Sequence, residues 1–106
     1  AHGTGAPDGD RAEAAALRTV FADSCPPVSS TKGLTGHMMG AGGIAEAIAC
    51  IRALNTGLLP GNYNLSTPGV DLPLLWETET RTIRAAMTNA FGFGGQNSSL
   101  VLRRWS

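Results

Sequence analysis

An excess of charge of either sign is absent from this chain of 106 residues, because eight Lys and Arg residues balance eight Asp and Glu residues. Domains that bind nucleic acid or an anionic membrane surface usually carry an excess or a patch of basic residues. The composition therefore predicts neither partner. Aromatic residues are few, at 6%, but 42% of the residues are hydrophobic, which is sufficient for the core of one globular domain.

A long uninterrupted hydrophobic run is also missing. The most apolar stretch, residues 41–54, contains Glu46 and Arg52 and is shorter than the roughly 20 apolar residues that span a bilayer. The first residues, AHGTGAPDGD, have neither the basic start nor the apolar segment of a signal peptide. We therefore predict a cytoplasmic protein without a membrane segment, in which Cys25 and Cys50 are reduced thiols.

A first helix is predicted from Asp10 onward. Asp10 and Glu13 have the spacing of an N-terminal capping box, in which each side chain bonds to the other residue's backbone N–H. Alanine and larger apolar residues follow at helical spacing through residue 21, and Pro26 and Pro27 end the segment. Residues 28–30 leave room for only a short strand.

A second helix is predicted over residues 42–55. Its larger apolar residues recur at intervals of four, three and three, and residues 55–57, Asn-Thr-Gly, favour its C-terminal end. The other faces are mostly alanine, so we expect this helix to pack closely on two sides inside an α/β body. The recurring residues are Ile44, Ile48, Ile51 and Leu54.

The remaining sequence predicts a loop and a pair of strands. Residues 59–71 are rich in Pro, Gly and Asn and indicate an irregular crossing loop. Residues 83–90 and 99–105 have strand character and flank the glycine-rich segment 92–97, a spacing typical of an antiparallel pair joined by a turn.

Two common site patterns are present only in weak form. Gly40, Gly42 and Ala45 satisfy G-x-G-x-x-A, but a dinucleotide site needs a buried strand directly before it and an acidic residue about 20 positions later. His2 and His37 could join a cysteine at a metal ion, yet none of these residues shows the short spacing of metal ligands. Neither a nucleotide cofactor nor a metal is predicted.

Three short motifs carry a more specific signal. They are HGT at residues 2–4, STKGLTGH at residues 30–37 and NAFGFGGQN at residues 89–97. Together they resemble the C-terminal half of a β-ketoacyl-[acyl-carrier-protein] synthase, an elongating condensing enzyme of the fatty-acid synthase II or polyketide ketosynthase type. The likeness covers the whole chain in order and includes Glu46 and two residues of the crossing loop, Pro60 and Asn64.

The resemblance implies a thiolase-like five-layer αβαβα fold, of which residues 1–106 would be most of the C-terminal half. It also implies a homodimer, or a heterodimer with a chain-length-factor subunit, that acts with acyl carrier protein. The N-terminal half of the same synthase would be the other partner and would carry the nucleophilic cysteine. No prosthetic group is implied, because the substrates are carried on the 4′-phosphopantetheine arm of acyl carrier protein.

The resemblance assigns His2 and His37 as the two catalytic histidines. Decarboxylation of a malonyl thioester places enolate charge on the thioester oxygen, and two neutral imidazole N–H donors would stabilise that charge. Lys32 matches the family's lysine behind the histidines, and Glu46 matches the carboxylate that pairs with it to orient His37. A buried ammonium needs such a partner, since an unpaired buried charge is costly.

Further matches concern the glycine-rich loop and the pantetheine arm. Phe93 matches the gating phenylalanine, whose backbone N–H contributes to a second oxyanion hole, and Thr4 matches a threonine along the pantetheine arm. Two positions depart from the family: Ala6 replaces a usual hydroxyl residue, and Gly61 replaces a usual proline. The glycines that would let the gating loop move are Gly92, Gly94 and Gly95.

Neither cysteine fits the role of nucleophile. That role requires a sharp turn at a helix N-terminus, whereas Cys25 precedes two prolines and Cys50 falls in the middle of the second predicted helix. We therefore expect this chain to be a synthase segment that is active only with its N-terminal half. One alternative is part of a catalytically silent, chain-length-factor-like subunit. Another is an independent binding module, in which residues 2–4 would lie far from residues 30–37.

Overall fold

The computed structural model describes residues 1–105. The N-terminal part contains helix α1 (Pro7–Phe21), the 3-10 turn η1 (Ala22–Ser24), the short helix α2 (Lys32–Thr35) and a second 3-10 turn, η2 (Met39–Ala41). Helix α3 (Gly42–Thr56) follows, and then strands β1 (Leu58–Leu59), β2 (Glu79–Thr80), β3 (Ala85–Gly92) and β4 (Gln96–Arg103). Within residues 1–105, the helices lack the length and apolar character needed to cross a bilayer.

Helix α1 begins earlier than predicted. Pro7 occupies its first turn, where a missing N–H costs nothing, and the Asp10 N–H donates to the Ala6 carbonyl. The predicted capping box at Asp10 and Glu13 is therefore wrong. The Glu13 side chain instead accepts hydrogen bonds from the backbone N–H groups of His2 and Gly3.

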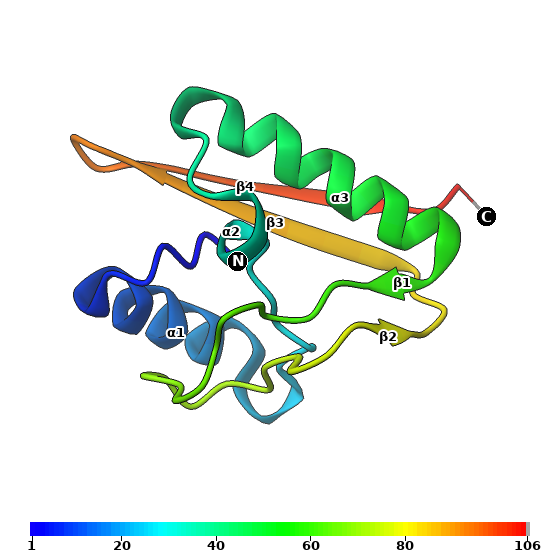
Figure 1. The fold of residues 1–106 in the computed structure, drawn as a ribbon, viewed down its shortest axis with the longest axis horizontal. Coiled ribbons are helices and arrows are strands. Elements are labelled where there is room, and N and C mark those ends of the chain that lie inside the picture. The colour runs from blue at the N-terminus through cyan, green and yellow to red at the C-terminus, as the bar shows by residue number, and fades with distance from the viewer. Residues whose placement is uncertain (106) are drawn as a thin grey trace.

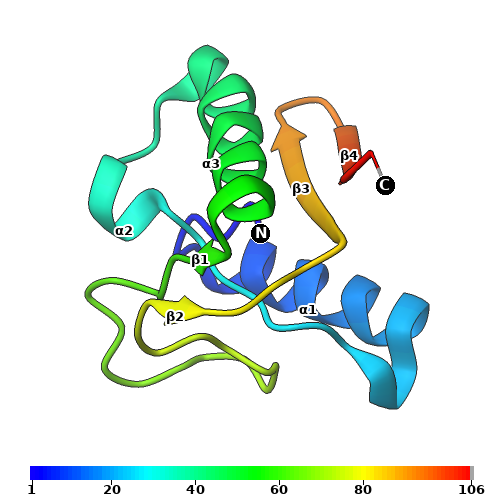
Figure 2. The same cartoon turned by 90° about the vertical axis from the view of Figure 1, so that its right-hand side faces the viewer.

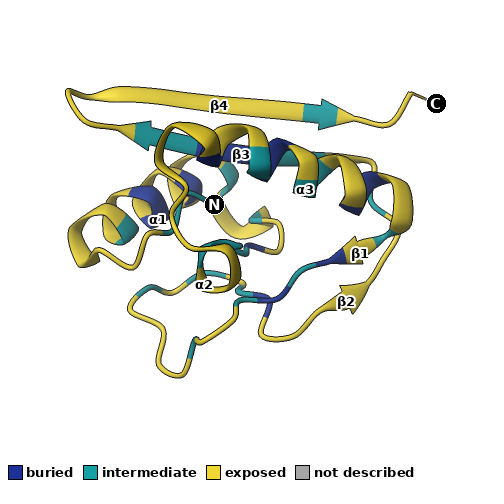
Figure 3. Ribbon diagram, turned by 45° about the horizontal axis from the view of Figure 1, so that its top comes forward, coloured by how far each residue is buried: buried dark blue, intermediate teal, exposed yellow. Residues whose placement is uncertain are grey.

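Helix α3 confirms the second predicted helix and ends at Gly57, which adopts the left-handed conformation. Figure 2 shows α3 lying alongside β3, and small residues such as Ala47 and Ala53 on its buried side permit this close packing. Most of its isoleucine stripe faces outward, since Ile44 is 66% exposed and Ile48 is 53% exposed. The outer surface of α3 is exposed along its length in Figure 3.

The predicted antiparallel pair is confirmed by the β3–β4 hairpin. Its register runs from Ala85 opposite Arg103 to Gly92 opposite Gln96, and residues 93–95 form the turn. The hairpin is the longest feature in Figure 1, and β4 is exposed over nearly all its length in Figure 3. Because consecutive strand residues point to opposite faces, β3 can hold polar groups of α1 and α3 on its two sides.

The crossing loop is confirmed as irregular over most of residues 59–71. Its first residue, Leu59, belongs to β1, which pairs with β2. Asn62 fixes the path of the loop by donating to the Val28 and Leu75 carbonyls and accepting from the Ser30 N–H. Val28 forms a single parallel bridge with Leu74, so the short strand predicted at residues 28–30 is reduced to one residue. The buried residues Ala53, Leu59 and Leu75 form a small hydrophobic core beneath this loop.

Gly61 lies where the chain passes close to a neighbouring segment. A Cβ atom added there would lie 2.5 Å from the backbone carbon of Glu77. We expect Gly61→Ala to destabilise the protein by about 1–3 kcal/mol, the usual cost of forcing extra atoms into a packed site. Thermal unfolding would measure this loss, with Gly69→Ala as the control because its added Cβ meets nothing within 4 Å. Equal stability of the two variants would contradict the prediction.

Candidate active site

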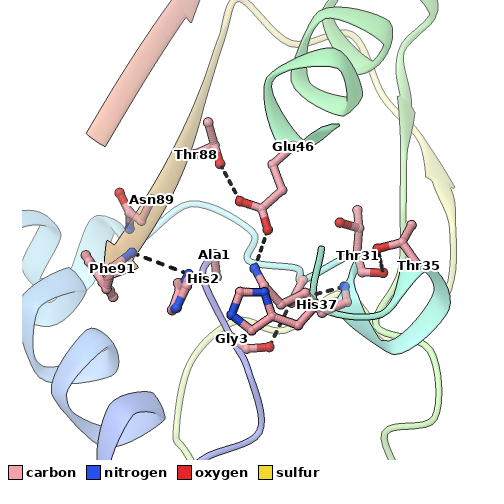
Figure 4. A network of polar contacts seen from close by, with 12 residues as sticks. Ala1, His2, Gly3, Thr31, Thr35, His37, Glu46, Thr88, Asn89 and Phe91 are labelled. Carbon is pink, nitrogen blue, oxygen red and sulfur yellow. Dashed lines mark hydrogen bonds and ion pairs between the residues drawn. The ribbon is translucent and has the colours of Figure 1, made fainter. Parts of the chain in front are cut away.

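A cavity of about 430 Å³ lies between the N-terminal segment, α3 and the β3–β4 hairpin. Its walls combine imidazole, ammonium and carboxylate groups with backbone from the glycine-rich segments that precede α3 and end β3. Figure 4 shows these polar side chains converging from separate parts of the chain. The chemically active residues among its lining are His2, Lys32, His37 and Glu46.

The two histidines lie side by side in this cavity. Their ring centroids are 5.6 Å apart and the ring planes are nearly perpendicular, at 87°. His2 also packs against the Phe91 ring, with centroids 5.2 Å apart. Residues separated by 35 positions in the sequence thus meet at one surface, where both can reach a single small group.

Hydrogen bonds define which nitrogen of each imidazole carries the proton. The Met39 N–H donates to Nδ1 of His37 at 3.2 Å, and the Phe91 N–H donates to Nδ1 of His2 at 3.4 Å. A neutral imidazole that accepts at Nδ1 carries its proton on Nε2. With Nδ1 occupied in this way, each ring when neutral has its proton on Nε2.

The electrostatic surroundings keep His2 neutral. Burial lowers the pKa of His2 below its ordinary value of 6.5, and the nearby Lys32 ammonium lowers this pKa further. Glu13 and Glu46 act in the opposite direction but with a smaller effect. At neutral pH the His2 ring is therefore a hydrogen-bond donor without charge.

Gly3 allows the HGT segment to lie against the turn that holds Lys32. Its φ angle is +42°, and an added Cβ would lie 2.7 Å from the Cβ of Ser30. The Ser30 hydroxyl donates to the Gly3 carbonyl at 3.0 Å. A side chain at Gly3 would separate these segments, so the glycine of this motif brings His2 close to Lys32.

Glu13 anchors the same segment from α1. Its two carboxylate oxygens accept from the His2 N–H at 2.9 Å and the Gly3 N–H at 3.0 Å, and Asn89 Nδ2 donates to it at 3.0 Å. Burial alone would raise the pKa of Glu13, but these hydrogen bonds outweigh it and lower the pKa below its ordinary value. Glu13 is therefore an ionised acceptor at neutral pH.

Lys32 and Glu46 form a buried ion pair behind the histidines. Their side chains are only 8% and 9% exposed, and the Lys32 ammonium donates to Glu46 Oε1. The other carboxylate oxygen, Oε2, accepts from the Thr88 hydroxyl of β3 at 3.3 Å. Each Glu46 oxygen thus has a partner, which is the arrangement that a buried charge requires.

The other predicted site residues differ in where they lie relative to the histidine cavity. Phe93 is 94% exposed at the tip of the hairpin, and Thr4 lines a second cavity of about 370 Å³, which Lys32 and His37 also line. Gly94 and Gly95 complete the turn with φ near +80°, and among the predicted glycines Gly92 lines the histidine cavity. The structure therefore brings His2, Lys32, His37 and Glu46 together and leaves the Phe93 ring and Thr4 outside that cluster.

The two cysteines lie outside the lining of the histidine cavity as the structure describes it. Cys25 follows η1 in a loop, and Cys50 lies in the middle of α3, where burial raises the pKa of its thiol. Over residues 1–105, His, Cys, Asp and Glu side chains form no group of three that could hold a metal ion.

Sequence reasoning missed several contributors to the site, among them Thr88, Asn89 and Met39. Thr88 and Asn89 are buried and each binds one of the two buried glutamates, and Met39 supplies the backbone N–H for His37. A signal for the first two was present, since adjacent Thr and Asn residues in a half-buried strand need hydrogen-bond partners. The Met39 contact depends on its left-handed backbone, with φ of +51°, which the sequence does not indicate.

The fold and cavity define an α/β protein that presents two imidazole rings side by side, each accepting a backbone N–H at Nδ1. Residues 1–66 match the family model described as "Beta-ketoacyl synthase, C-terminal domain". The chain belongs to the β-ketoacyl synthase family and has the thiolase-like α/β fold predicted for it.

Individual relatives agree with the family match. The chain is 42% identical over 106 residues to 3-oxoacyl-[acyl-carrier-protein] synthase 1 of Escherichia coli (strain K12), covering 97% of this chain and 26% of the relative. It is also 42% identical to 3-oxoacyl-[acyl-carrier-protein] synthase 2 of Coxiella burnetii, covering 98% of this chain and 26% of the relative. The mitochondrial synthase of Arabidopsis thaliana is likewise 42% identical, over 95% of this chain and 24% of the relative. The chain thus spans about a quarter of the length of these curated relatives.

Proposed function

We propose that this chain supplies the decarboxylation centre of a 3-oxoacyl-[acyl-carrier-protein] synthase, an acyltransferase of fatty-acid or polyketide chain elongation. The observation that carries the proposal is the His2–His37 pair, with ring centroids 5.6 Å apart and Nδ1 of each ring occupied by a backbone N–H. Two Nε2–H donors then remain for one substrate oxygen. The relatives' names supply the substrate class, acyl groups on acyl carrier protein.

In the proposed first step, malonyl thioester carried on the phosphopantetheine arm loses carbon dioxide. The bond between the carboxylate carbon and the α-carbon breaks, and its electron pair forms an enolate whose charge lies on the thioester oxygen. Hydrogen bonds from His2 and His37 to that oxygen stabilise the charge as it develops. The Lys32 ammonium, held in place by Glu46, lies behind the rings and lowers the pKa of His2, which favours the neutral ring.

In the second step, the enolate carbon attacks the carbonyl carbon of an acyl group held as a thioester on cysteine. The new carbon–carbon bond forms, the carbonyl oxygen takes negative charge, and collapse of the intermediate expels the cysteine thiolate and leaves a 3-oxoacyl product. We assign the backbone N–H of Phe93 to the second oxyanion hole. Its position in a turn with Gly94 and Gly95 supports movement of this loop toward the substrate.

The nucleophilic cysteine belongs, in this proposal, to the N-terminal half of the same synthase. The exposed isoleucine stripe of α3 supports a second body packed on that face, because large contiguous apolar surfaces are rarely left in water. A homodimer and docking of acyl carrier protein belong to the same proposal, as does pantetheine contact at Thr4. Cytoplasmic location stays a prediction, since two relatives are named as mitochondrial and chloroplastic proteins.

The alternatives are less well supported. An independent binding module required the HGT segment to lie far from residues 30–37, whereas Ser30 donates to the Gly3 carbonyl and the histidine rings are neighbours. A silent chain-length-factor-like subunit would have no use for two neutral donors beside a buried Lys32–Glu46 pair. Sequencing the upstream half separates that role from catalysis, because a cysteine in the nucleophile turn indicates an enzyme.

Reconstitution tests the proposal directly. We expect this chain, coexpressed with a chain that carries the rest of the synthase, including the N-terminal half, to convert malonyl and acyl groups on acyl carrier protein into the 3-oxoacyl product, because the chain covers only 26% of the bacterial relatives. Mass spectrometry of the carrier protein would detect the product, and the rest of the synthase alone is the control. The proposal fails if the folded pair neither decarboxylates malonyl thioester nor makes product. Turnover by the 106-residue chain alone would instead contradict the assignment of the nucleophile to the other half.

A further inference from the structure

Strand β3 carries two adjacent buried polar residues that bind different buried glutamates. Thr88, 8% exposed, faces Glu46 and hence Lys32, whereas Asn89, 6% exposed, faces Glu13 and hence the backbone of His2. Their side chains leave opposite faces of the strand, as strand geometry requires. Figure 4 shows both residues on β3 directly beside the polar cluster.

The Asn89 amide is held between Glu13 and the neighbouring strand. Ser99 of β4 lies opposite Asn89 in the register, and its hydroxyl donates to Asn89 Oδ1 at 2.8 Å. On the other side, Asn89 Nδ2 donates to Glu13 Oε1 at 3.0 Å, and because an ionised carboxylate only accepts, this contact decides the amide orientation while Ser99 holds the amide in place. The reverse orientation would bring Asn89 Oδ1 against the Glu13 carboxylate and would repel it.

Glu13 transmits this constraint to the HGT segment. Oε1 accepts from the His2 N–H as well as from Asn89, and Oε2 accepts from the Gly3 N–H. A carboxylate fixed at both oxygens holds the two peptide planes that flank the His2 Cα, and so fixes the position from which the imidazole extends. The Phe91 N–H, two residues beyond Asn89 on the same strand, binds the His2 ring itself.

We propose that Asn89 and Ser99 are positioning residues for His2, acting through Glu13. This inference rests on the proposed function, because it concerns the place of His2 relative to the enolate oxygen. A misplacement of about 1 Å in such a donor can lower a rate by roughly 100-fold. The hairpin thereby determines the position of the His2 imidazole, although neither Asn89 nor Ser99 contacts the substrate.

The experiment uses the reconstituted pair and measures two half-reactions separately, decarboxylation of malonyl thioester and loading of the acyl group onto cysteine. Asn89→Leu is expected to lower kcat for decarboxylation about 10- to 100-fold. Ser99→Ala is expected to lower it several-fold, by freeing the Asn89 amide to rotate, and Ser99→Thr, which keeps the hydroxyl, should restore it. Acyl loading should stay within about twofold of wild type in all three variants, because it does not use His2.

The matched control is Ser66→Ala, which removes an exposed loop hydroxyl and should change neither half-reaction. In a Glu13→Gln background, Ser99→Ala should add nothing to the loss, because residues acting through one intermediary are not additive. Equal losses of loading and decarboxylation, or a full effect of Ser99→Ala without Glu13, would overturn the inference. Failure of the proposed function gives a different result, since His2→Ala would then leave decarboxylation unchanged.

Discussion

Alanine at His37 is expected to lower the rate of malonyl-thioester decarboxylation by the reconstituted pair about 100- to 1000-fold. The reason is that His37 and His2 each retain one Nε2–H for the enolate oxygen, and removing one leaves the developing charge half stabilised. Release of carbon dioxide from malonyl thioester measures the step without interference from condensation.

The specificity of this effect can be checked within the same protein. His2→Ala should produce a loss of similar size, and the double variant should lose less than the product of the two single effects, because both donors serve one oxygen. Loading of an acyl group onto the nucleophile should persist in all three. If His37→Ala loses loading and decarboxylation in parallel, the damage lies in folding, and the assignment of His37 as an oxyanion donor is not supported.

Replacing Lys32 with methionine is expected to destabilise the protein by about 3–5 kcal/mol, because it leaves the Glu46 carboxylate buried without its cation. The Thr88 hydroxyl is a single neutral donor and cannot replace an ammonium. Urea denaturation of the reconstituted pair would measure the change. The site is sensitive because the paired side chains are only 8% and 9% exposed.

A second variant separates stability from activity at this pair. Lys32→Met combined with Glu46→Leu removes both charges and should recover most of the stability, since apolar replacements of buried ion pairs are often neutral or stabilising. Decarboxylation should remain low, because the fixed cation near His2 is still absent. Full stability of the Lys32→Met single variant would contradict the burial of the pair.

Much of the fold follows from local sequence. The helix over residues 42–56 and the hairpin around the glycine-rich turn depend on short-range periodicity and turn residues, and both are as predicted apart from shifts of a few residues. The start of α1 could not be predicted in the same way. The capping pattern at Asp10 and Glu13 is a local signal, but the Glu13 carboxylate is recruited by the backbone of His2 and Gly3 and by Asn89, 76 residues away.

The candidate site shows the same difference between residues that a local motif indicates and residues whose role depends on the folded structure. His2, Lys32, His37 and Glu46 could be named from motifs because their chemistry is carried by residue type and order. Thr88 could be suspected only as a buried polar residue, and its partner Glu46 depends on which side of β3 it faces; Ser99 could not be named, because its contact depends on the pairing register of β4. The placement of Phe93 at an exposed turn, and not in the histidine cavity, also depends on three-dimensional geometry.

The outward isoleucine stripe of α3 bears on how such a protein is made. During synthesis on the ribosome the N-terminal half of the proposed synthase emerges first and can already be compact when Ile44 and Ile48 appear. It can then act as a template that covers these side chains as they leave the exit tunnel. If residues 1–106 were produced without that template, the apolar face of α3 would stay exposed to water. We therefore expect the isolated segment to bind chaperones or to aggregate into inclusion bodies.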